Sequence, residues 1–149
     1  MELGVDRKLG RSAYIKLVDG SAQQEITIED VKNLLDQYVS RMTKLGDQLD
    51  WEYEKSAFPY TVQEKMQDGE KYLQLTATDP LYTFLLIGVG KEEADGKTRH
   101  YVQVTIPDEE HRTPGDVAKG NEFTKYLGKH LKAETHLFNG RIIYNNPRK

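Results

Sequence analysis

An Asn-Gly pair near the end of the chain is the feature that most restricts the local fold. Asn139 and Gly140 stand between residues 136–138 and 141–144, two short segments rich in residues that favour strands. A two-residue type I′ turn requires positive φ at both central positions, and Asn and Gly adopt positive φ more readily than other residues. The pattern predicts a β-hairpin over residues 136–144 that closes on a type I′ turn.

The length and composition indicate one cysteine-free domain. A chain of 149 residues, 37% of them hydrophobic, is long enough to bury about 68–70% of its unfolded surface around a single core. The absence of cysteine excludes disulfides, thiolate metal ligands and cysteine nucleophiles. No run of about 18 apolar residues is present, and Asp6, Arg7 and Lys8 stand where a secretory signal would be apolar. We therefore expect a cytoplasmic domain that does not span a membrane.

Charge is spread evenly along the sequence. The formal net charge is −3, and 30% of the residues are charged, with both signs interleaved. This is typical of an ordinary soluble surface and differs from the basic footprint of a nucleic-acid-binding domain. Nucleic acid is therefore an unfavoured partner on charge alone.

Residues 1–11 are expected to form a flexible lead, which could be a remnant of an expression vector, ahead of a domain over residues 12–149. Gly4, Asp6 and Gly10 interrupt any periodicity there. The first strand is predicted over Ser12–Val18. Its alternation places residues 13, 15 and 17 on one face and Tyr14 and Lys16 on the other.

The clearest helix is predicted from Thr27 to about residues 44–46. Thr27 and Asp30 match a short-armed capping box, and Gly46 readily adopts the left-handed conformation that ends a helix. Apolar residues recur at helical spacing, so one stripe should be buried. The stripe consists of Val31, Leu34, Leu35, Tyr38, Val39 and Met42.

Alternating patterns predict strands between this helix and residue 106. One strand would run through Leu49, Trp51 and Tyr53, and two antiparallel neighbours would be joined by an Asp68-Gly69 turn. The apolar run 81–89 is our candidate for the central strand of the sheet. An exposed loop is expected over residues 90–97, followed by a strand over 98–106.

A second helix is predicted over about residues 121–132, before the final hairpin. The resulting order is β-α-β-β-β-β-β-α-β-β. This order predicts a single α+β domain with a mainly antiparallel sheet and two amphipathic helices.

One loop carries a candidate metal site. His111 has Asp108, Glu109 and Glu110 beside it, and carboxylates with an imidazole can hold a divalent ion. Consecutive side chains point apart, however, and no second histidine follows at ligand spacing. Asp108, Glu110 and His111 are therefore weak metal candidates, and a solvated acidic loop is the favoured interpretation.

The other histidines have local explanations. His100 begins a predicted strand and His136 begins the final hairpin, so the two rings could meet if those strands pair. A structural role is the favoured interpretation for each. His130, in the last turn of the second helix, would interact favourably with the helix C-terminus when protonated.

No motif for a nucleophile or a nucleotide is present. The sequence has no G-x-S-x-G and no P-loop, and Gly88-Val89-Gly90 lacks both the third glycine and the following helix of a dinucleotide turn. We therefore predict no catalytic residues, no cofactor-binding residues and no cofactor.

One basic stripe supports an alternative function. Lys125, Lys129 and Lys132 recur on one outer face of the second predicted helix. Together with tyrosines on strands they could form a single-stranded nucleic-acid site, in which bases stack on the sheet beside a cationic helix. These tyrosines are Tyr72, Tyr82 and Tyr101. A solvated helix face explains the lysines equally simply.

Three segments carry a resemblance to a known family. Residues 12–18, 57–60 and 136–142 are similar to those of a small family of uncharacterised proteins from bacilli, a domain of unknown function. The resemblance covers nearly the whole chain after Arg11. It implies a compact cytoplasmic α+β protein, and it implies no activity, cofactor or site residue.

The sequence favours a non-enzymatic domain that binds a protein partner, or itself, through an exposed sheet face or edge. The basis is the lack of catalytic motifs together with nine tyrosines, a residue type that is enriched at protein interfaces. The alternative is a module that binds single-stranded nucleic acid or a small ligand. A metal-dependent enzyme that uses His100, His111 or His136 ranks third.

Overall fold

A single antiparallel sheet organises the protein. The structure is a computed structural model that describes residues 9–49 and 57–147. Within these residues seven strands pair in the order β2-β3-β4-β5-β1-β6-β7. Their bounds are β1 Leu9–Lys16, β2 Tyr60–Gln67, β3 Glu70–Ala77, β4 Phe84–Ala94, β5 Lys97–Pro107, β6 Glu134–His136 and β7 Ile142–Tyr144. β1 lies between β5 and β6, so the first strand connects the central hairpins to the C-terminal one.

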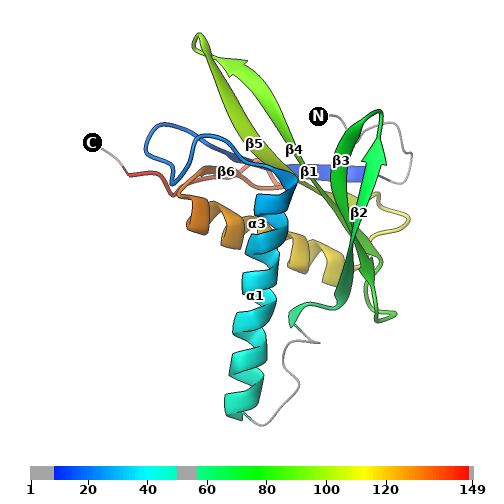
Figure 1. The fold of residues 1–149 in the computed structure, drawn as a ribbon. Coiled ribbons are helices and arrows are strands. Elements are labelled where there is room, and N and C mark those ends of the chain that lie inside the picture. The colour runs from blue at the N-terminus through cyan, green and yellow to red at the C-terminus, as the bar shows by residue number, and fades with distance from the viewer. Residues whose placement is uncertain (1–8, 50–56, 148–149) are drawn as a thin grey trace.

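Two helices, α1 (Ile28–Leu49) and α3 (Pro114–Leu131), pack against one face of this sheet (Figure 1). Side chains alternate between the faces of a strand, and one buried cluster takes alternate residues of the inner strands together with residues of both helices. Its strand members include Ile15, Leu17, Leu73, Leu75, Leu85, Ile87, Val102, Val104 and Ile106, and its helix members include Val31, Leu35, Phe123 and Leu127. The helices contact each other where the rings of Tyr38 and Phe123 lie 5.3 Å apart. Both helices therefore cover the same face.

The predicted class is confirmed: the chain is a single α+β domain, and its described residues form an antiparallel sheet and the two helices α1 and α3. The predicted antiparallel neighbours around Asp68-Gly69 are β2 and β3. No helix among the described residues has the length and apolarity needed to cross a membrane.

The first helix begins as predicted and ends later. The Thr27 amide donates to Asp30 Oδ2 and the Asp30 amide donates to Thr27 Oγ1, each at 3.1 Å, which completes the short capping box. α1 continues through Gly46 to Leu49, because one glycine lowers helix stability by only about 1 kcal/mol. The strand predicted through Leu49, Trp51 and Tyr53 is therefore wrong at Leu49. Its other two residues lie outside the described part of the chain.

Two tight turns join the central strands. Asp68 and Gly69 have φ of 51° and 81°, and Asp95 and Gly96 have φ of 54° and 75°, as type I′ turns require. The exposed loop expected over residues 90–97 is wrong, because β4 runs to Ala94 and β5 starts at Lys97. Charged side chains are tolerated there since the ends of this long hairpin are largely exposed.

The C-terminal hairpin exists, but its predicted type I′ turn is wrong. Gly140 has φ of 87°, whereas Asn139 does not have positive φ. The Leu137 amide donates to the Arg141 carbonyl at 2.8 Å, and the Gly140 amide donates to the Leu137 carbonyl at 3.0 Å. This is a three-residue loop with glycine at its left-handed position. Asn139 Oδ1 instead accepts from the Arg141 amide at 2.9 Å, so the asparagine acts through its side chain.

The second helix starts seven residues before its predicted start. Thr113 caps it, Pro114 occupies its first turn, and Asp116 closes a full capping box. The prediction begins the helix at Asn121 because residues 108–120 are polar. Glycine occupies helical position 120 because a Cβ there would lie 2.9 Å from the Ile106 side chain.

Two strand boundaries also differ from prediction. β1 begins at Leu9, inside the expected lead, and its first residue pairs with Pro107 of β5. The run 81–89 was our candidate for the central strand, but its strand, β4, begins at Phe84 and lies beside β5, which is the middle strand. Residues 79–82 instead form a turn, in which the Tyr82 amide donates to the Asp79 carbonyl.

Candidate functional site

The face of the sheet opposite the helices is the candidate site, because neither α1 nor α3 packs on it. The strand register arranges its side chains in rows across the sheet. One row runs Gly88, Gln103, Tyr14, His136, Ile142, and the next runs Gly90, Tyr101, Lys16, Glu134, Tyr144. We call this surface the uncovered face.

Aromatic and aliphatic side chains lie at two places on the uncovered face, with His136 and Glu134 of β6 between them. The rings of Tyr14 and Tyr101 pack edge to face with centroids 5.5 Å apart. Beyond them at the sheet edge, Ile142 is 37% exposed and Tyr144 is 50% exposed. We call these four residues the tyrosine strip. Their rings offer apolar area with polar tips, a combination that is enriched at protein interfaces.

A charged pocket adjoins the tyrosine strip. It has a volume of about 360 Å³ and is lined by Lys16, Glu92, Arg99, Glu134 and Asn146, together with residues 18, 19, 94 and 95. Lys16 Nζ lies 3.1 Å from Glu92 Oε1, and the buried Oδ1 atom of Asn146 has no hydrogen-bond partner. The pocket therefore presents both signs of charge beside an apolar strip.

The middle of the uncovered face is polar and internally satisfied. Gln103 Nε2 donates to Ser12 Oγ at 3.0 Å, and Ser12 Oγ lies 2.8 Å from Thr105 Oγ1. Gln103 and Thr105 are buried, and a buried polar group must be hydrogen-bonded to avoid a large desolvation cost. These residues therefore stabilise the sheet and are poor candidates for ligand contacts.

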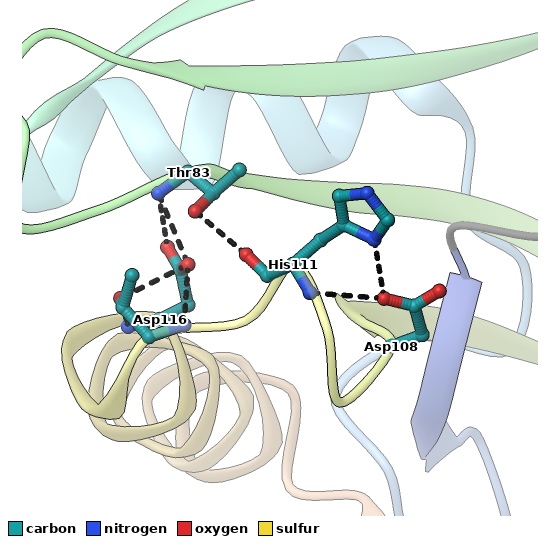
Figure 2. A network of polar contacts seen from close by, with 5 residues as sticks. Thr83, Asp108, His111 and Asp116 are labelled. Carbon is teal, nitrogen blue, oxygen red and sulfur yellow. Dashed lines mark hydrogen bonds and ion pairs between the residues drawn. The ribbon is translucent and has the colours of Figure 1, made fainter.

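A second polar network lies on the helix side, around the buried carboxylate of Asp116 (Figure 2). Asp116 accepts from the Tyr60 hydroxyl at 2.7 Å, from the Thr83 amide at 3.0 Å and from the Thr113 hydroxyl at 3.1 Å. Burial, and then the hydrogen bond to Asp116, raises the pKa of Tyr60 far above its usual range. All these groups satisfy one another at the N-terminus of α3, so the network holds the fold together.

The acidic loop after β5 brings two of the three metal candidates together. His111 Nδ1 lies 2.6 Å from Asp108 Oδ1, which also accepts from the His111 amide at 3.0 Å, and Figure 2 shows this pair beside Thr83. The hydrogen bond from His111 lowers the pKa of Asp108. Among the described residues no three His, Asp or Glu side chains are placed to hold an ion. The metal site therefore remains a sequence prediction.

The structure separates the other histidines. His100 lies on the helix side of β5, the same face as Val102 two residues later, which is part of the core. His136 lies on the uncovered face beside Tyr14. β1 separates their strands, so the two rings do not meet across a strand pair. His136 Nε2 lies 2.8 Å from Glu134 Oε1. His130 lies near the C-terminus of α3, with its ring 6.0 Å from that of Tyr126.

The residues of the nucleic-acid alternative lie on two sides of the molecule. Lys125 and Lys129 are exposed on α3, and Lys132, also exposed, adopts the left-handed conformation that ends this helix. Tyr101 lies on the uncovered face, as does Tyr72, whose neighbour Leu73 faces the core. Tyr82 is outside the strands and packs on Tyr60 with ring centroids 5.6 Å apart. One bound strand would not contact the basic helix and the tyrosines together.

Sequence reasoning placed Tyr14 and Lys16 on a common face but did not identify them as site residues. Their partners across the sheet come from β5, β6 and β7, and strand order is not visible in one sequence. The available signal was the alternation in the first strand, together with tyrosine and isoleucine in the last one.

Comparison with known proteins confirms the resemblance. A family described as Domain of unknown function (DUF1885) matches residues 11–147. A crystal structure described as a protein of unknown function from Bacillus stearothermophilus is 40% identical in sequence, with a TM-score of 0.51. The similarity covers 83% of this chain and 91% of that one. None of the curated proteins compared with the chain matches it.

Proposed function

We propose, for a chain that belongs to the family Domain of unknown function (DUF1885), a binding role in which the uncovered face docks against a second copy of the chain. The observation that carries this proposal is the tyrosine strip, two pairs of large side chains on a sheet face that neither helix covers. Sheets pack face to face at about 10 Å when their facing side chains interdigitate. The strip supplies such side chains.

The charges beside the strip favour a second copy as the occupant. A twofold interface applies the same patch to itself, so each charge needs an opposite charge within that patch. The adjoining pocket supplies both signs. It is lined by the basic residues Lys16 and Arg99 and by the acidic residues Asp19, Glu92, Asp95 and Glu134. A uniformly acidic or basic patch would repel its own copy.

The placement of the histidines supports binding over metal-dependent catalysis. His100 and His136 lie on opposite faces of the sheet. His100 lies near the start of β5, whereas His111 lies in the loop after the end of that strand. A catalytic site needs several such groups converging on one reacting atom. A cytoplasmic location is part of the proposal and is supported by the cysteine-free composition.

Sedimentation equilibrium of the full chain tests this role. We expect a concentration-dependent monomer–dimer equilibrium, with the dimer lost in Ile142→Lys and Tyr144→Lys, because each substitution replaces apolar contact area with a charge that must lose its water on docking. Leu81→Lys is the matched control, since Leu81 is 70% exposed and lies outside the strip. A wild-type chain that stays monomeric up to about 100 μM, where a weak interface would already form, contradicts the proposal. Equal weakening by Leu81→Lys would place the interface elsewhere.

A further inference from the structure

A cleft between the two helices concentrates positive charge. It has a volume of about 380 Å³ and is lined by Arg41 of α1 and by Tyr126, Lys129 and His130 of α3. Three of these four side chains are basic, and no described carboxylate lines the cleft. It lies on the helix side of the sheet and is therefore separate from the uncovered face.

The described residues do not neutralise the basic groups of the cleft. Arg41 and Lys129 form no ion pair with any residue that the structure describes. Some other lysines are paired: Lys16 lies 3.1 Å from Glu92, and Lys119 lies 2.9 Å from Glu122 one turn earlier on α3. In a chain of net charge −3, unpaired cations that converge from two helices repel each other unless an anion joins them.

The end of helix α3 does not account for the arginine of the cleft. Basic residues in a last turn interact favourably with free carbonyl groups. Here the Lys132 amide already caps the Gly128 and Lys129 carbonyls, and the Ala133 amide donates to the Gly128 carbonyl at 2.9 Å. Arg41 belongs to the other helix, eight residues before its end.

Tyr126 forms a fixed wall of the cleft. Its hydroxyl donates to the Leu34 carbonyl at 3.2 Å, and its ring packs edge to face on Tyr38 with centroids 5.2 Å apart. A wall held in this way is available to an organic group before any ligand arrives, which reduces the ordering cost of binding.

We propose that this cleft binds a small phosphorylated molecule. Arginine presents a planar set of donors that matches a phosphoryl group, and lysine adds a compact charge. The cleft is larger than one phosphoryl group and lies within the range of small-ligand pockets, about 300–1,000 Å³. The phosphoryl group contacts Arg41 and Lys129, and the remainder of the molecule lies against Tyr126.

The test is a titration of the full chain with pyrophosphate at constant ionic strength, followed by amide chemical shifts. We expect saturable shifts around residues 41, 126, 129 and 130. Arg41→Gln and Lys129→Gln should each weaken binding about tenfold, the effect of losing one charged hydrogen bond. Lys125→Gln, which removes an exposed lysine outside the cleft, should weaken it less than about twofold. All three side chains are exposed, so the variants should fold.

Other outcomes overturn the proposal. Shifts that do not saturate, or that sodium chloride reproduces, indicate general screening of charge. Equal binding of citrate indicates a site without preference for phosphoryl groups. Tighter binding of a single-stranded oligonucleotide, weakened equally by Lys125→Gln and Lys132→Gln, indicates an extended basic surface in place of the cleft.

Discussion

The hydroxyl of Tyr60, in edge strand β2, donates a 2.7 Å hydrogen bond to Asp116, in the first turn of α3. Tyr60 is 5% exposed and Asp116 is fully buried. The same carboxylate accepts from the Thr83 amide just before β4. One side chain therefore connects an edge strand, the entrance of an inner strand and the N-terminus of a helix, and its loss should be felt by all three.

Asp116→Ala should lower the free energy of unfolding by about 3–5 kcal/mol. The substitution leaves the Tyr60 hydroxyl and the Thr83 amide buried without acceptors, and each costs about 1–3 kcal/mol. Urea unfolding followed by circular dichroism measures the loss. Asp30→Ala is the control, because it breaks the exposed capping box of α1 and should cost only about 1 kcal/mol. Equal losses for the two variants would show that Asp116 does no more than cap its helix.

Stability should fall above pH about 10, the usual pKa of tyrosine, and Tyr60 should contribute to the fall. Burial beside Asp116 raises the folded-state pKa of Tyr60 above its unfolded value. Its contribution is fully present below the unfolded pKa and decreases as pH rises, because only the unfolded chain releases the proton. Tyr60→Phe should show a shallower decline between pH 10 and 11. Identical slopes for the two proteins would contradict the raised pKa.

The sequence predicted the features that depend on residues close in the chain. It missed the features that depend on contacts between residues distant in the chain. The stripe through Leu34 and Leu35 and the Asp68-Gly69 turn are local, and both are confirmed. The start of α3 was missed because residues 108–120 are polar and show no helical stripe of apolar residues. This first part of the helix also contains Gly115 and Gly120. Close packing against Tyr82 and Ile106 explains these glycines, and no sequence spacing reveals such contacts.

The two surfaces proposed to bind ligands were hidden for the same reason. The tyrosine strip requires that β1 lie between β5 and β6, which brings Tyr14 beside residues that are distant in sequence. The cleft requires that Arg41 of α1 and Lys129 of α3 line the same space. Lys129 was visible in the sequence as part of a basic stripe, but Arg41, the other basic residue proposed to contact the phosphoryl group, belongs to the other helix.

His111→Ala should raise the pKa of Asp108 towards its ordinary value. The hydrogen bond from His111 is the largest cause of the lowered pKa, and burial opposes it. A carboxylate with a depressed folded-state pKa stabilises the fold above its unfolded pKa, and that stability decreases as pH falls through the folded value. Carboxyl chemical shifts between pH 2 and 6 follow this titration directly. An unchanged Asp108 pKa in the variant would mean that backbone amides, not the imidazole, hold the charge.

Leu35→Ala should destabilise the protein by about 2–5 kcal/mol, because truncation of a buried leucine leaves a cavity. Leu35 is 1% exposed in the core between α1 and the sheet. Met66→Ala is the control, since Met66 is 65% exposed and should change stability by less than about 0.5 kcal/mol. Thermal unfolding of the two variants should separate them clearly, and similar midpoints would argue against α1 being packed on the sheet.

Gly128→Ala should destabilise the fold, although alanine favours helix by about 1 kcal/mol over glycine. A Cβ at position 128 would overlap Thr135 Oγ1 and lie 3.1 Å from Thr135 Cβ. Thr135 is fully buried in β6, so it cannot move away, and overpacking of this kind costs about 1–3 kcal/mol.

A double-mutant cycle with Thr135→Ala isolates the contact between α3 and β6. Thr135→Ala removes the overlapping oxygen, together with the hydrogen bond that the hydroxyl accepts from Asn145 Nδ2. Gly128→Ala should therefore cost about 1 kcal/mol less in the Thr135→Ala background than in the wild type. An equal cost in both backgrounds would show that the overlap at Thr135 is not the reason for glycine at this position.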